Sequence, residues 1–221
     1  MQILEKIQGV IERTYDLESE HRVSDFVVTC PEFARAFGLR PDATALQEQV
    51  LVRGDSAAVD LAVCLDQQVL AQLRDHDPMA SLHDGNLEAF WTALEGVSHF
   101  VYLVWNVSRR RQVTQLELEL QAEVDKFVTT ALLVAAQQGG RVPTELHSWL
   151  FDLCRLDESL AQEEADRYAR ANRYAGRFCQ QLASRYLRSG GDSMFPEIRR
   201  FYRLSQRGKL RHIESARARN R

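Results

Sequence analysis

Two long apolar segments dominate the sequence: NLEAFWTALEGVSHFVYLVWNV at residues 86–107 and TQLELELQAEVDKFVTTALLVAAQ at residues 114–137. Apolar residues cover most of the helical circumference of both segments, which is typical of buried helices. Because only a short polar run separates them, we expect two consecutive helices that pack together as the core of the fold. Thr114 and Glu117 have the spacing of a capping box and predict the start of the second helix. Gly139 and Gly140 predict its end.

The clearest strand pattern lies upstream of these helices. Residues 48–53 and 59–65 flank the turn-forming residues Gly54-Asp55-Ser56, and the second segment alternates apolar with polar or small residues. This pattern predicts a β-hairpin. Since a lone hairpin is marginal in water, we expect it to pair with a short strand at residues 24–29 and to pack on helices.

The remaining segments have helical spacing of apolar residues. They are residues 2–17, 67–74, 143–154, 157–188 and a final helix that begins near Pro196. The predicted fold class is therefore α+β and predominantly α-helical, with a small antiparallel β-hairpin or sheet near the N-terminus packed on a helical bundle.

No linker-like composition interrupts this order of elements. We therefore predict a single compact domain at residues 1–204, with the sheet region at 24–66 and the helical bundle at 67–204. The predicted remainder, residues 205–221, is a basic and frayed C-terminal tail.

The composition is that of a globular protein, with 45% hydrophobic and 27% charged residues. The N-terminus lacks the unbroken apolar region of a secretory signal. The most apolar run, residues 127–136, is about half as long as a membrane span requires. We therefore expect a cytoplasmic protein without a membrane span.

Each of the two apolar segments carries a polar seam, a row of polar residues at helical spacing. The first seam consists of Glu95, His99, Tyr102 and Asn106, and the second of Glu119, Glu123, Lys126 and Thr130. If the two helices are antiparallel and reverse near Arg110, residues at equal distance from Arg110 along the chain lie level with each other. This register places His99 between Glu119 and Glu123, and Glu95 beside Lys126. We therefore predict that the two polar seams meet at the same height in the core.

Three interpretations of the polar seams stay open. In the first, the metal ligands are Glu95, His99, Glu119 and Glu123, which bind a divalent ion such as Zn, Fe or Mn between facing helices. A metal-bound water would then give a hydrolase-like enzyme, with Glu95, His99 and Glu123 as the catalytic candidates. In the second, Glu95 pairs with Lys126 and His99 pairs with a glutamate, which forms a structural network that fixes helix register. In the third, one seam faces solvent or a partner.

Other catalytic patterns are missing from the sequence. Both Gly-Gly pairs follow predicted helices, whereas phosphate-binding loops precede them. There is no Gly-x-Ser-x-Gly motif, and the adjacent Ser98 and His99 point about 100° apart on a helix. P-loop nucleotide hydrolysis and serine hydrolase chemistry are therefore not expected.

The charge is distributed unevenly along the chain. Residues 195–221 contain nine Arg and Lys against Glu197 and Glu214, a net charge of +7, so the remaining residues carry −10 of the total of −3. This uneven charge distribution favours one of two arrangements: the C-terminal segment binds an acidic partner, or it docks on the acidic remainder of the chain. The predicted binding residues are Arg199, Arg200, Arg203, Arg207, Lys209 and Arg211.

These observations lead to one main functional hypothesis and two alternatives. The main hypothesis is a cytoplasmic, adaptor-like regulatory protein that binds a protein partner with its cationic C-terminal helix. The alternatives are the metal-dependent hydrolase described above and a nucleic-acid-binding accessory protein that uses the C-terminal basic residues. The sequence predicts neither the partner's identity nor the oligomeric state.

Overall fold

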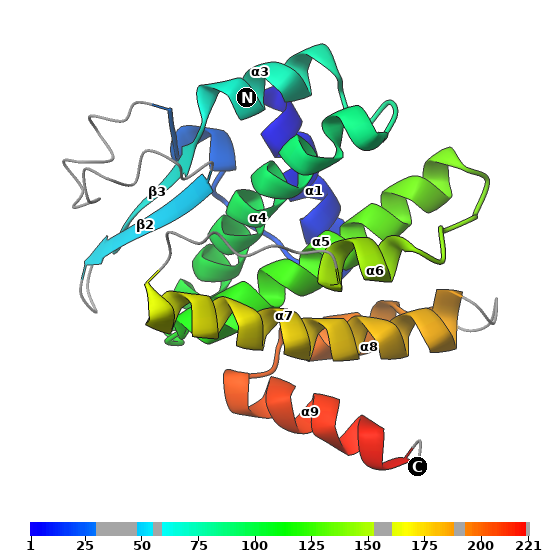
Figure 1. Cartoon of the computed structure of the whole chain (residues 1–221). Helices are drawn as coiled ribbons and strands as arrows, with labels where there is room; N and C mark the ends of the chain where they lie inside the picture. Colours follow the sequence, from blue (N-terminus) through cyan, green and yellow to red (C-terminus); the bar gives the residue numbers. More distant parts are fainter. Residues whose placement is uncertain (30–47, 55–58, 153–160, 188–192, 220–221) are drawn as a thin grey trace.

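A computed structural model of the chain describes residues 1–29, 48–54, 59–152, 161–187 and 193–219 (Figure 1). The described helices are α1 Gln2–Tyr15, α3 Gln67–Asp75, α4 Asp84–Val107, α5 Gln115–Gln137, α6 Leu146–Phe151, α7 Gln162–Leu182, α8 Phe195–Tyr202 and α9 Gln206–Arg219, with a 3-10 turn at Val23–Asp25 and a π-helical turn at Ala183–Leu187. The described strands are β1 Val27–Val28, β2 Glu48–Gly54 and β3 Val59–Leu65. The predicted fold class, α+β with a helical majority and a small sheet near the N-terminus, is confirmed.

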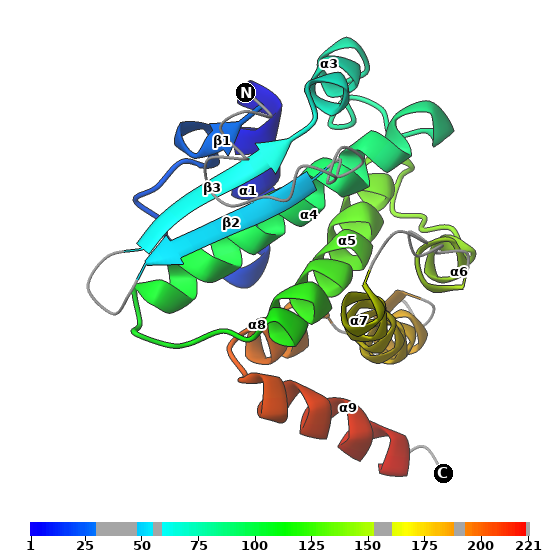
Figure 2. The same cartoon turned by 60° about the vertical axis from the view of Figure 1, so that its left-hand side comes forward.

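Helices α4 and α5 form the centre of the fold, as their apolar sequences predict. The sheet lies across α4, and α7 runs alongside α5 (Figures 1 and 2). Phe90, Phe100 and Phe127, all fully buried, fill the space around the two helices. The side chain of Thr114 accepts a hydrogen bond from the backbone N–H of Glu117 at 3.1 Å, so the predicted cap of α5 is present. Both glycines after α5 have positive φ, 62° at Gly139 and 87° at Gly140, a conformation that favours glycine.

The sheet has the strand order β1-β3-β2. Strands β2 and β3 are antiparallel, with Val50 opposite Val63, as the hairpin pattern predicts. The turn residues 55–58 lie outside the described residues. The prediction of an entirely antiparallel sheet is wrong in one respect, because β1 pairs with β3 in parallel, with Val27 opposite Val63. The sheet is therefore mixed. β1 follows the short turn at Val23–Asp25 and is not joined to β3 by a hairpin, so no tight turn makes the two strands antiparallel.

The C-terminal segment is packed on the body of the protein. Helix α8 contacts α1, and α9 contacts α7 and extends along the outside of the bundle (Figures 1 and 2). The predicted frayed tail at residues 205–221 is wrong for the greater part of its length, because Gln206–Arg219 is helical and Lys209 and Ile213 are buried. The sequence did not predict this docking because Lys209 lies between Arg207 and Arg211.

Among the described residues, no helix is both long enough and apolar enough to cross a membrane.

Candidate functional site

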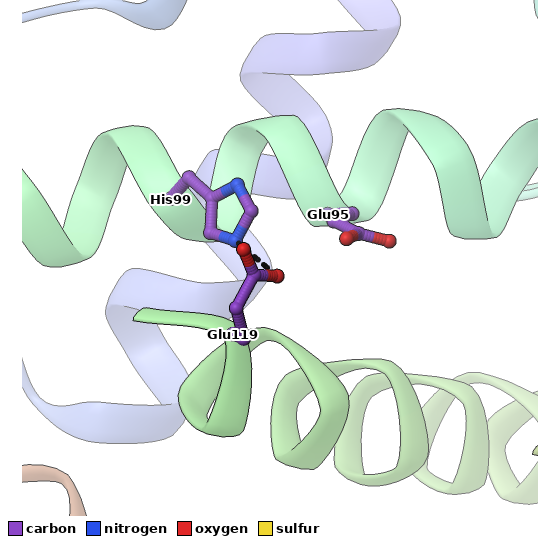
Figure 3. A group of neighbouring side chains, drawn as sticks. All are labelled: Glu95, His99 and Glu119. Carbon is purple, nitrogen blue, oxygen red and sulfur yellow. Dashed lines mark ion pairs between the residues drawn. The ribbon is translucent and has the colours of Figure 1, made fainter. Parts of the chain in front are cut away.

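The polar seams of α4 and α5 meet in the core at the predicted height. Glu95 and His99 lie one turn apart on α4, and Glu119 faces them from α5. His99 Nε2 lies 3.8 Å from Glu119 Oε2, and one ligand atom from each of the three residues lies within 4.8 Å of the others. Figure 3 shows the imidazole of His99 and the carboxylate of Glu119 facing each other, with Glu95 farther along α4. Within the described part of the chain, this is the one group of three potential metal ligands.

Glu123, the fourth predicted ligand, lies outside this group. Lys126 Nζ donates to Glu123 Oε1 at 2.7 Å and to Glu95 Oε2 at 3.0 Å, so the lysine bridges the two carboxylates. Burial opposes the charge on Lys126, but the two glutamates raise its pKa above the ordinary value, and it remains a cation. The antiparallel register inferred from the sequence predicts this Glu95–Lys126 pair.

The two carboxylates that flank Lys126 differ in their protonation. Burial raises the pKa of Glu95, but the attraction of Lys126 and His99 outweighs it, so the pKa lies below the ordinary value. For Glu123 burial dominates, and its pKa lies above the ordinary value despite the ion pair. Glu95 is therefore more readily ionised than Glu123, and Glu123 more readily holds a proton.

Two cations approach the carboxylates of the site. Lys126 contacts Glu95 and Glu123, and Arg167 Nε lies 3.9 Å from Glu119 Oε1. Buried carboxylates require such compensation, so both cations stabilise the arrangement.

A second buried polar cluster lies deeper between the same helices and was not predicted. Asp125, which has no exposed surface, accepts hydrogen bonds from Tyr15 and Ser98 at 2.5 Å and from Gln121 at 2.7 Å. Burial raises its pKa to about 6, although these hydrogen bonds favour the anion. The signal available in the sequence was an aspartate in a helix that is predicted to be buried.

Lys209 of α9 belongs to this second cluster. The sequence predicts it to be an exposed binding residue, and this prediction is wrong. Its side chain is fully buried and donates to Gln121 Oε1. Its Nζ lies 4.7 Å from the ring centres of Tyr102 and Phe201. Burial lowers the pKa of Lys209 well below its ordinary value, although Asp125 opposes this change.

Glu117 connects the start of α5 to the start of α9. Its side chain does not complete a capping box; it accepts from the hydroxyl of Tyr102 at 2.5 Å, from Arg111, and from the backbone N–H of Gln206 at 3.1 Å. Arg111 also donates to the carbonyl of Leu204 at 3.0 Å. The C-terminal helix pair is therefore joined to the core by partly buried polar contacts.

The other predicted binding residues divide into two groups. Arg199 donates to the carbonyl oxygens of Thr14 at 2.9 Å and Arg13 at 3.1 Å, and Arg203 donates to that of Asp16 at 3.2 Å. These two arginines thus bind the C-terminal end of α1, where cations are favoured. The second group is exposed and consists of Arg200, Arg207 and Arg211.

An open groove of about 930 Å³ lies between α6, α7 and α9. Exposed Arg173 and Arg177 line it from α7, the half-buried Phe151 gives it apolar surface, and Asp152 and Glu214 add acidic groups. The sequence did not predict this groove, because α6, α7 and α9 meet only through tertiary packing.

Comparison with protein-family models, curated proteins and solved structures gave no match for this chain.

Proposed function

We propose that this chain is an interaction protein that binds an acidic segment of a protein partner in the groove between α6, α7 and α9. The observation that carries the proposal is the combination of two exposed arginines on α7 with apolar surface from the half-buried Phe151 in one open groove of about 930 Å³. Arginine is enriched at protein interfaces because its planar guanidinium pairs with carboxylates in two-pronged geometry.

Exposed residues elsewhere on α6 and α9 also favour a protein partner. Arg207 and Arg211 of α9 are exposed, and Trp149 on the outer side of α6 is 39% exposed. Exposed tryptophan and arginine together are typical of interaction surfaces. Asp152 and Glu214 give the groove both signs of charge, which favours a segment of defined charge order over a uniformly negative polymer.

A display selection with short random peptides tests this proposal on the full chain. The counter-selection uses the double variant Arg173→Glu/Arg177→Glu, and Arg74→Glu, an exposed change on α3, is the matched control. We expect acidic peptides with one or two apolar residues to bind wild type and Arg74→Glu. Their affinity for the double variant should be lower by more than about tenfold, and their affinity for wild type should fall as the salt concentration rises. Peptides that bind all three proteins equally would contradict the proposal.

The two alternative functions stay predictions. Single-stranded RNA and DNA oligonucleotides in the same titration test the accessory-protein interpretation, because binding through phosphate contacts falls steeply with salt. The hydrolase interpretation requires a metal ion first.

A further inference from the structure

The group formed by Glu95, His99 and Glu119 is independent of the groove. We propose that these three residues form a binding site for one divalent first-row transition-metal ion between α4 and α5. Zinc, manganese and iron(II) are the candidates, because imidazole nitrogen with carboxylate oxygen suits these ions and no thiolate belongs to the group.

The distances require only small movements. A tetrahedral ion with bonds of about 2.0–2.1 Å holds its ligand atoms roughly 3.4 Å apart. His99 Nε2 and Glu119 Oε2 are 3.8 Å apart, and all three ligand atoms lie within 4.8 Å of one another. Helical bundles assemble metal sites from carboxylate and histidine side chains on facing helices. Here two ligands lie one turn apart on α4, at i and i+4, and the third lies on α5.

Neighbouring cations hold the carboxylates in place. Lys126 contacts Glu95 through Oε2, and Arg167 approaches Glu119 through Oε1, the oxygen opposite the one that faces His99. Groups that orient ligands from behind are a general feature of metal sites. Lys126 and Arg167 also weaken the attraction of the carboxylates for a bound cation, so we expect an exchangeable ion.

Burial and access differ between the three ligands. The side chains of His99 and Glu119 are 6% and 9% exposed, so the ion would lie where electrostatic attraction is screened little by water. The side chain of Glu95 is 20% exposed and gives the ion a route from solvent. Waters would complete the coordination on this side.

Glu123 provides a matched control inside the same seam. It is a buried glutamate of α5 like Glu119, and its carboxylate is bound by Lys126. The proposal therefore predicts that these two neighbouring glutamates, which are similar in burial, differ in their effect on metal binding.

The test uses full-length protein stripped with a chelator, dialysed and titrated with Co²⁺, then with Zn²⁺ in competition. We expect one equivalent of Co²⁺ with visible ligand-field bands, which Zn²⁺ displaces, and a higher thermal midpoint with metal. Glu119→Gln and His99→Gln are expected to weaken binding by more than about tenfold, and Glu123→Gln to retain it. Circular dichroism checks that each variant is folded, and Glu95→Gln replaces any variant that is not.

Three results would overturn the proposal. The first is the lack of saturable one-to-one binding by folded wild type. The second is equal affinity of wild type and Glu119→Gln. The third is a loss of metal affinity in Glu123→Gln as large as that in Glu119→Gln, which would indicate a general effect of the negative charge in the polar seam.

Discussion

Asp125 is expected to make the protein more stable as the pH falls from 7.5 to 5. Its carboxyl is fully buried, and its pKa of about 6 lies above the ordinary value of 3.8. The folded state therefore holds this proton more tightly than the unfolded state does, so protonation favours folding. The difference in pKa corresponds to about 3 kcal/mol, present in full below pH 3.8 and lost as the pH rises through 6. Between pH 7.5 and pH 5 the linkage relation gives a gain of about 1.4 kcal/mol from this group.

The measurement is urea unfolding of wild type and Asp125→Asn at both pH values. Asparagine cannot titrate, so the difference in unfolding free energy between the two proteins should grow by about 1.4 kcal/mol at the lower pH. Any constant cost of the substitution, such as the poorer match of an amide to the hydroxyls of Tyr15 and Ser98, cancels in this comparison. Asp75→Asn, an exposed change on α3, is the control and should show no such growth. A difference that does not change between the two pH values would refute the reasoning.

Three further substitutions test the contacts that hold the fold together. Tyr15→Phe removes a hydrogen bond to the Asp125 carboxylate and should lower the free energy of unfolding by about 1.5–3 kcal/mol in urea; a loss below about 0.5 kcal/mol would show that water replaces the hydroxyl. Arg199→Ala should cost about 1 kcal/mol because it releases the end of α1, whereas its exposed neighbour Arg200→Ala should stay within about 0.5 kcal/mol; equal effects in thermal unfolding would contradict the docking role. Thr114→Ala should cost about 1 kcal/mol through loss of the α5 cap, and Thr114→Asp, which keeps the acceptor, should restore most of it in the same assay.

The sequence predicted the parts of the fold that local patterns determine. Apolar periodicity located α4 and α5, and alternation located β2 and β3. The antiparallel register placed Glu95 beside Lys126 and His99 near Glu119, because a short connection forces two helices into an antiparallel pair. The parallel pairing of β1 was beyond such reasoning, since strand direction at an edge depends on where the chain enters the sheet.

The second polar cluster could not be assembled from the sequence because its members come from four separate segments. Tyr15, Ser98, Asp125 and Lys209 meet only through tertiary packing. In the sequence Lys209 belongs to a run of basic residues with Arg207 and Arg211 on either side, which predicts a cationic surface. In the helix it shares a face with Ile213, four residues on, and that spacing was the available indication of burial.

The burial of Lys209 changes how the C-terminal segment has to be tested. A deletion after Ser193 would remove the exposed arginines, but also Lys209 beside Asp125, the Gln206 backbone donor to Glu117, and the Arg199 contacts with α1. Buried carboxylates left without these partners are costly, so a truncated chain would lose stability whatever its partner is. Loss of binding after such a deletion would therefore not distinguish an interaction surface from a core element. Charge reversal at Arg173, Arg177, Arg207 and Arg211 leaves the buried contacts intact, and it is the experiment that separates the two roles.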